Sequence, residues 1–236
     1  MIELLHQIEQ IDTQIFLFFN GFHNEYWDYF MMIFSDRFVW VPFYASFIFV
    51  LLKNFPVKVV MSTIVVITLI ILFSDQTASG ILKPLVARMR PSNPDNPISP
   101  MVHVVQGYRG GRYGFPSSHA ANAWSMAFFA QYLVRRSKLT IFLCLWALIT
   151  SYSRMYLGVH YFGDILIGTL IGFLYATLYY YIFQYFLRKH TERFKPNHDI
   201  RFASVPIITG LVSIWVIICT SGILSFYNIP LRSTNV

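Results

Sequence analysis

Long stretches without a charged residue dominate this chain and limit what it can fold into. The run from Ile165 to Leu187 has 23 uncharged residues, and the run from Phe202 to Leu231 is longer. A helix needs about 20 apolar residues to cross the hydrocarbon core of a bilayer, so each run is long enough for one crossing. Hydrophobic residues make up 56% of the 236 residues and charged residues only 12%, which excludes an ordinary soluble domain. The sequence predicts an integral membrane protein.

The whole chain, residues 1–236, is predicted to form one membrane-embedded, all-α domain with about six transmembrane helices. The predicted spans are 27–52, 59–77, 116–134, 139–153, 165–187 and a crossing within 202–231, with a kink allowed in the first. Residues 1–25 carry Glu3, Glu9 and Asp12 among apolar residues at helical spacing and lack the basic start of a signal peptide. We expect this segment to form an amphipathic helix in the membrane interface.

Three stretches place ionisable side chains beside these apolar runs, where charge is costly and therefore points to function. The first runs from Lys83 to Pro91 and has the form K-x6-R-P, within a long polar loop predicted at 78–116. The second is Pro-Ser-Ser-His at 116–119. The third, at 153–164, has the form S-R-x5-H-x3-D and is the candidate catalytic segment.

The third stretch suggests a catalytic pair. His160 and Asp164 are four residues apart, so on a helix the carboxylate can hold one imidazole nitrogen and leave the other exposed. A histidine nucleophile or general base requires that arrangement. Arg154 could bind an oxyanion such as phosphate. Taken alone, the stretch is equally compatible with an interfacial histidine and an unrelated ion pair.

The other two stretches supply candidate anion-binding groups. Lys83 and Arg90 are seven apart, so on a helix they would share one face and repel each other unless an anion lay between them. Ser117 and Ser118 would present hydroxyls and N–H groups at a helix N-terminus, which favours anions, and His119 could protonate a leaving alkoxide. The alternative for a basic residue at a helix end is snorkelling toward the interface. Snorkelling is the prediction for Arg88, Arg109 and Arg112, whereas Asp75 is expected to pair with a nearby Lys or Arg.

In order and spacing, the three motifs resemble those of the type-2 phosphatidic acid phosphatase family, K-x6-R-P, P-S-G-H and S-R-x5-H-x3-D. The resemblance covers about residues 75–175, and it departs at Ser118, where the family usually has glycine. It implies hydrolysis of a phosphate monoester or diphosphate through a phosphohistidine, with no metal or other cofactor. The implied catalytic residues are His160, Asp164 and His119. The implied phosphate-binding residues are Lys83, Arg90, Arg154, Ser117 and Ser118, the last through its backbone N–H. We expect activity to survive the serine at 118, because serine also has that N–H group.

An active site between membrane spans implies an amphiphilic lipid phosphate as substrate. The resemblance suggests three bacterial candidates: undecaprenyl diphosphate, ranked first, then lipid A, and also phosphatidylglycerol phosphate. The loops at 53–58, 135–138 and 188–201 hold ten of the eighteen Lys and Arg residues. Because such loops stay in the cytoplasm, we expect a protein of the bacterial inner membrane whose three motifs face the periplasm.

Other functions compete with this hypothesis. Two histidines and an aspartate could bind a metal, although the surrounding Lys and Arg would repel a cation. Vanadium-dependent haloperoxidases share the motifs, but they are soluble. A lipid-phosphate transporter or binding protein would need the cations but no nucleophile. Nucleic acid is not expected as a partner, because the basic residues are scattered over short loops rather than gathered on one face. The sequence leaves the oligomeric state open.

Overall fold

A computed structural model describes residues 2–190 and 200–231, so residues 191–199 of the predicted basic loop lie outside the described residues. The described chain is helical and contains no strand beyond one isolated bridge, between Met89 and Tyr113. Its α-helices are α1 (Ile2–Asn20), α2 (Glu25–Ser35), α3 (Val41–Asn54), α4 (Val57–Asp75), α5 (Lys83–Val86), α6 (Ser118–Val134), α7 (Ser137–Tyr156), α8 (Phe162–His190) and α9 (Val205–Tyr227).

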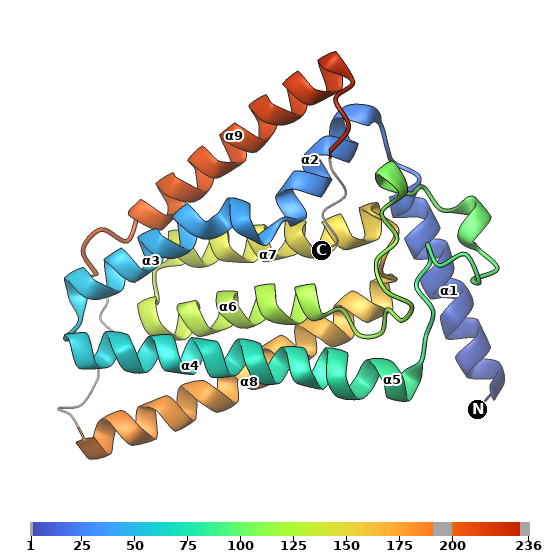
Figure 1. The fold of residues 1–236 in the computed structure, drawn as a ribbon. Coiled ribbons are helices and arrows are strands. Elements are labelled where there is room, and N and C mark those ends of the chain that lie inside the picture. Colours follow the sequence, from blue (N-terminus) through green and yellow to red (C-terminus); the bar gives the residue numbers. More distant parts are fainter. Residues whose placement is uncertain (1, 191–199, 232–236) are drawn as a thin grey trace.

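Helix α6 occupies the middle of the bundle, and its main neighbours are α8, α7 and α4 (Figure 1). Two glycines let α8 come close to it. A Cβ on Gly172 would lie 2.5 Å from the carbonyl oxygen of Ala121, and a Cβ on Gly168 would collide with the carbonyl oxygen of Ser117. Small residues spaced four apart allow membrane helices to pack with their backbones in near contact. This packing holds the beginning of α6 beside the beginning of α8.

Among the residues that the structure describes, four helices are long and apolar enough to cross a membrane, and a bent pair raises the number to five. The four are Val57–Val86, Ser137–Tyr156, Phe162–Leu187 and Val205–Tyr227. The bent pair joins α2 to Arg37–Asn54 at an angle of 64°. The bend falls at Asp36, whose carboxylate accepts the N–H of Phe38 (2.8 Å), so the kink allowed in the first predicted span is present. The remaining predicted span corresponds to α6, which has 17 residues and is not among the five. Six crossings therefore stay a prediction.

The predicted loop at 78–116 begins later than expected. Residues Gln76–Leu82 continue α4 as a wider π-helical segment, and α5 extends the helix to Val86. The helix stops there because Ala87 adopts a left-handed conformation (φ 51°). Arg90 lies beyond this point in an extended segment, where its N–H bonds the carbonyl of Arg112 (3.2 Å). The prediction that Lys83 and Arg90 share one helical face is therefore wrong.

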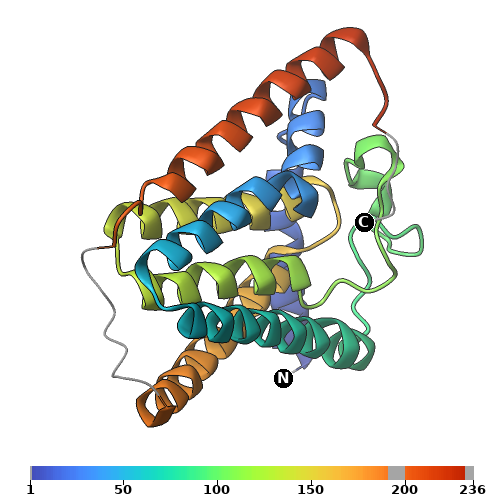
Figure 2. The same ribbon diagram turned by 60° about the vertical axis from the view of Figure 1, so that its left-hand side comes forward.

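The two ends of the bundle differ. The segment at 87–117, the turn between α7 and α8, and α1 gather at one end, while the short α3–α4 and α6–α7 turns lie at the other (Figures 1 and 2). Asn20, at the end of α1, fastens this arrangement. Its side chain donates to the carbonyls of Met155 (3.2 Å) and Tyr156 (2.9 Å) and accepts the N–H of His103 (2.8 Å). The N-terminal segment is thus a helix, and its position in a membrane interface stays a prediction.

Candidate active site

The turn between α7 and α8 and the start of α8 hold the predicted catalytic pair. His160 lies just before α8, Asp164 lies in the first turn of that helix, and both are almost fully buried. The Nδ1 atom of His160 lies 3.2 Å from Oδ2 of Asp164, which also accepts the N–H of Tyr161 (3.1 Å). The predicted contact between imidazole and carboxylate is therefore present, and Nε2 is the nitrogen that the carboxylate does not engage.

Lys83 joins this site from the end of the α4–α5 helix. Its ammonium donates to the hydroxyls of Ser79 (3.1 Å) and Ser118 (3.4 Å). The hydroxyl of Ser79 also lies 3.4 Å from Asp75 Oδ1, so Asp75 is linked to Lys83 through a serine rather than by the predicted direct pair. The hydroxyl of Ser118, which a glycine would lack, therefore accepts a hydrogen bond from the lysine.

Two arginines approach from other segments. Arg90 donates its Nε–H to the carbonyl of Tyr113 (3.1 Å). Arg154, at the end of α7 and only 2% exposed, donates to the hydroxyls of Tyr108 (2.8 Å) and Ser35. Its Nε is buried and has no hydrogen-bond partner among the described residues.

The three cations Lys83, Arg90 and Arg154, which we call the cation cluster, have neutral partners. In the described part of the chain, none of them forms an ion pair with a carboxylate. Buried charge without a counter-ion is unfavourable, so such a cluster is typical of a site that binds an anion.

The cation cluster acts directly on both histidines. Burial, followed by the charges of Arg90, Arg154 and Lys83, holds the pKa of the His160 imidazole well below 6.5. The imidazole is therefore neutral at neutral pH, as a nucleophile must be. His119 lies close enough to the same three cations and to His160 for their charges to act on its imidazole. The structure thus brings together the ionisable residues that the three motifs singled out.

Ser117 lies at the N-terminus of α6, as predicted, and its role as a phosphate ligand stays a prediction. Its hydroxyl accepts the N–H of Ala120 (3.4 Å) as the cap of α6, and its own N–H donates to the carbonyl of Asp164 (2.9 Å). A helix N-terminus carries partial positive charge, and this one presents His119 in its first turn. The cap therefore fixes the start of α6 against the start of α8.

Arg88 does not snorkel, and the prediction that it does so is wrong. Its Nη1 donates to Asp12 Oδ2 (2.7 Å) and to Asp164 Oδ1 (3.1 Å), and its guanidinium carbon lies 3.7 Å from the ring centre of Tyr161. Sequence analysis missed Asp12 and Arg88 as parts of this site. The available signal was that Asp12 lies four residues from both Ile8 and Phe16, so it falls in an apolar row of the helix.

The two other basic residues of this segment behave differently from each other. Arg109 binds the carbonyl of Ser92 and the hydroxyl of Ser99 (3.1 Å), so it fastens the segment to itself instead of snorkelling. Arg112 is exposed, and its guanidinium carbon lies 5.5 Å from the ring centre of Tyr113.

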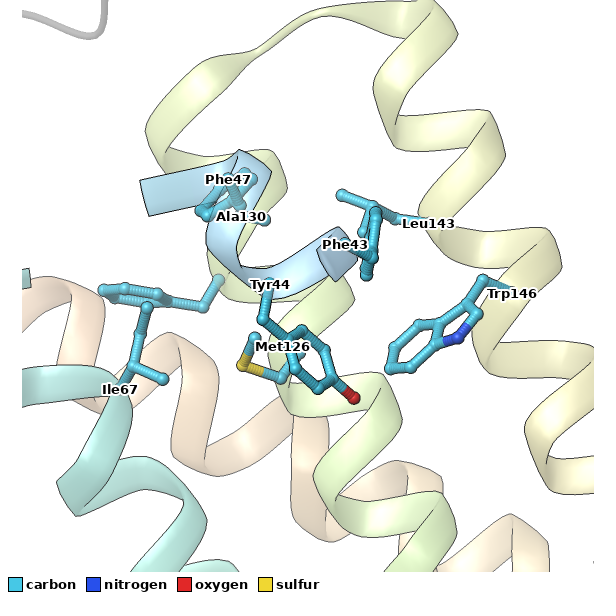
Figure 3. A pocket seen from close by; sticks show the side chains of 9 residues that line it. Phe43, Tyr44, Phe47, Ile67, Met126, Ala130, Leu143 and Trp146 are labelled. Carbon is cyan, nitrogen blue, oxygen red and sulfur yellow. The ribbon is translucent and has the colours of Figure 1, made fainter. Parts of the chain in front are cut away.

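A cavity of about 490 Å³ opens beside His119 and Ser118 and extends between α3, α4, α6 and α7. Its walls away from the histidine are mainly aromatic and aliphatic. Figure 3 shows a neighbouring small pocket, which shares Tyr44, Met126 and Trp146 with the cavity. The arrangement can therefore hold an anionic group at the cation cluster and an apolar chain beside it.

The donor set favours phosphorus chemistry. A neutral histidine oriented by a carboxylate, a second histidine and three cations without counter-ions can attack a phosphate and stabilise the charge on its oxygens. Among residues 2–190 and 200–231, no three His, Cys, Asp or Glu side chains form a set that could hold a metal ion.

Comparisons with known proteins agree with this chemistry. Residues 60–188 match the model of the PAP2 superfamily. The chain is 45% identical to a lipid A 4′-phosphatase of Bacteroides thetaiotaomicron over 94% of this chain and 98% of that protein. It is 33% identical to a lipid A 4′-phosphatase of Porphyromonas gingivalis over 77% of this chain and 76% of that protein. The crystal structure of Aquifex aeolicus LpxE has the same fold, with a TM-score of 0.55 and 20% identity over 72% of this chain and 94% of that one.

Proposed function

The chain belongs to the PAP2 superfamily and is a phosphoric monoester hydrolase of the membrane, and on that premise we propose that its substrate is lipid A. The observation that carries the proposal is the near full-length similarity to a protein named for that activity. Undecaprenyl diphosphate is the first candidate that the sequence suggests and lipid A the second, and the two relatives favour the reverse order.

The geometry of the site supports an acylated substrate. The phosphate would lie between the cation cluster and His160, close to the start of α6. The cavity of about 490 Å³ beside His119 has mainly apolar walls away from the histidine, and this part could hold an acyl chain of the same molecule. An apolar surface contributes to affinity mainly when apolar groups of the ligand are buried on it. A water-soluble phosphate ester without an acyl chain would therefore gain nothing from this part of the cavity.

The reaction follows from the residues that face the phosphate. Nε2 of His160 attacks phosphorus as the bond from phosphorus to the sugar oxygen breaks, and His119 gives its proton to that oxygen. His119 then takes a proton from the water that attacks the phosphohistidine, which releases phosphate and restores both histidines. Lys83, Arg90 and Arg154 stabilise the charge on the non-bridging oxygens, which is the main contribution of a protein to phosphoryl transfer.

We place the site at the periplasmic face of the inner membrane, with α6 as a sixth crossing and α1 in the interface. The charge distribution supports this orientation. The short turns at the end of the bundle away from the site contain Lys53, Lys58, Arg135, Arg136 and Lys138, and basic loops favour the cytoplasm.

The test measures the loss of phosphate from lipid A by mass spectrometry of the lipid, after a reaction run with EDTA present. We expect the detergent-purified protein to remove the 4′-phosphate, and EDTA to have no effect because the cation cluster repels divalent metals. His160→Ala should abolish release, whereas Glu9→Gln, which changes an exposed side chain of α1, should leave it unchanged. Undecaprenyl diphosphate and phosphatidylglycerol phosphate are assayed in parallel. Hydrolysis of one of these without hydrolysis of lipid A would refute the substrate, and no hydrolysis at all would favour a binding or transport protein.

A further inference from the structure

Arg88 is held between two carboxylates that lie on either side of it in the sequence, each 76 positions away. One is Asp12 on α1, at 2.7 Å, and the other is Asp164 on α8, at 3.1 Å. We call these three residues the carboxylate cluster. Asp12 is only 8% exposed, and the Arg88 side chain is 20% exposed. Because all three groups are largely withdrawn from water, their interactions are stronger than those of surface ion pairs.

Asp12 also contacts the first turn of α8 directly. Its Oδ1 accepts the N–H of Gly163 (2.8 Å), the residue next to Asp164. A Cβ at position 163 would lie 2.8 Å from Asp12 Oδ2, so the glycine permits this close approach. A carboxylate at the N-terminus of a helix is favoured by the unpaired N–H groups and by the helix dipole. Asp12 is therefore fixed by α8 as well as by Arg88.

A stack of side chains holds α1 in the same place. Phe16, one turn after Asp12, is fully buried and packs on Tyr161, with ring centres 5.4 Å apart. Tyr161 in turn lies under the guanidinium of Arg88. The face of α1 that carries Asp12 and Phe16 thus rests on the residues adjoining His160.

The charge balance gives Asp12 a catalytic consequence. If Arg88 faced Asp164 alone, the pair would be neutral and the carboxylate would stabilise positive charge on His160 poorly. With Asp12 sharing the guanidinium, the carboxylate cluster keeps one net negative charge. Phosphorylation of Nε2 leaves the imidazole of His160 cationic while Nδ1–H points at Asp164, so this negative charge lowers the energy of the intermediate.

We propose that Asp12 of the N-terminal helix is a positioning residue of the catalytic pair, acting through Arg88 on Asp164. It sets the orientation of the Asp164 carboxylate and preserves its charge toward His160. The inference rests on the proposed phosphatase function and makes α1 a part of the catalytic unit.

The experiment compares Asp12→Asn with the matched control Glu9→Gln on the same helix. Asparagine can still accept the N–H of Gly163, but the substitution removes the negative charge of Asp12 that is paired with Arg88. We expect kcat of Asp12→Asn to fall about tenfold or more, as for misplaced catalytic groups, while KM stays within about twofold. The double variant Asp12→Asn/Arg88→Gln should lose no more than the worse single variant, because both act through the same carboxylate.

Three results would overturn the inference. The first is that Asp12→Asn is as active as Glu9→Gln. The second is that the kcat losses of the two single variants multiply in the double variant. The third is that the loss of kcat is explained entirely by a lower melting temperature of the variant in detergent. All variants are also assayed with p-nitrophenyl phosphate. If lipid A is not hydrolysed but this ester is, the proposed substrate fails while the role of Asp12 is still decided. If the wild type hydrolyses neither, both proposals fail.

Discussion

Arg88 and Arg90 are two residues apart in one motif, yet they meet opposite electrostatic environments. Arg88 belongs to the carboxylate cluster and donates to both Asp12 and Asp164. Arg90 belongs to the cation cluster, and its side-chain partner is a backbone carbonyl, that of Tyr113. Both environments border the same histidine–aspartate pair. The difference teaches that partners, rather than residue type or spacing, decide what a buried cation does.

The physical reason is the cost of burying charge. A buried arginine with carboxylate partners is neutralised, so it can fix the geometry of those carboxylates but has little attraction left for a ligand. A buried arginine without a counter-ion remains unfavourable until an anion arrives. On this account the cation cluster binds phosphate and the carboxylate cluster orients the nucleophile. Substitutions on the two sides should therefore affect different kinetic constants.

The largest effect is expected at Arg154, the most buried member of the cation cluster. Arg154→Gln removes a charge and an unpaired Nε–H from the phosphate site, so kcat/KM for lipid A should fall by about 10²–10³-fold. Arg154→Lys keeps the positive charge but loses the planar set of N–H donors of the guanidinium, so it should retain more activity than Arg154→Gln.

Arg112→Gln is the matched control for this prediction, because Arg112 is an exposed basic residue of the same segment as Arg90. It should leave kcat/KM unchanged. Equal activity of Arg154→Gln and Arg112→Gln, at similar melting temperatures, would show that Arg154 does not contact the phosphate.

A smaller effect should separate the two neighbouring arginines. Arg88→Lys keeps one positive charge but cannot span Asp12 and Asp164 in the same way, so kcat should fall about tenfold with little change in KM. Arg90→Lys changes a residue that we propose binds the phosphate, so it should raise KM as well as lower kcat. Steady-state kinetics with lipid A measures both. If Arg88→Lys and Arg90→Lys change KM by the same factor and kcat by the same factor, the proposed difference between the two clusters is wrong.

The smallest expected effect concerns pH. Because the pKa of His160 lies well below 6.5, the nucleophile stays neutral as the pH falls through 6.5, and it is protonated only in more acidic solution. Arg90→Gln removes one cause of this lowering, so the pKa should rise and the acid limb of kcat/KM should move to higher pH. Burial is the largest cause and remains, which limits the shift.

The profile of Arg112→Gln should coincide with that of the wild type, and the ionisation of the substrate is the same in every measurement. A shift of the Arg90→Gln limb to lower pH would contradict the assigned electrostatics of His160.

Much of the site could be predicted because its signals are local. The spacing of four residues predicted the contact between His160 and Asp164, and the motifs brought Lys83, Arg90, Arg154 and His119 into one site. The carboxylate cluster could not be predicted in this way. Arg88 lies 76 positions from both of its carboxylate partners, so no periodicity connects them.

The fold was predicted at a similar level of detail. Apolar run lengths predicted membrane-spanning helices, and the kink in the first span is present at Asp36. The start of the polar segment was wrong, because the π-helical turn at Gln76–Leu82 and the left-handed Ala87 have no clear sequence signal. The sixth crossing stays a prediction because α6, with 17 residues, is not among the helices that are long and apolar enough to cross a membrane.

The central claim is that His160 is the nucleophile, and the most direct measurement is a search for its phosphorylated form. His119→Ala removes the group that we propose activates water, whereas p-nitrophenyl phosphate needs no proton on its leaving group. The variant should therefore accumulate a phosphoryl group, detectable by mass spectrometry of peptides after a neutral or alkaline quench. We expect this group to be attached to His160 and to be absent from His119→Ala/His160→Ala. A phosphoryl group on another residue, or continued phosphate release by the double variant, would contradict the claim.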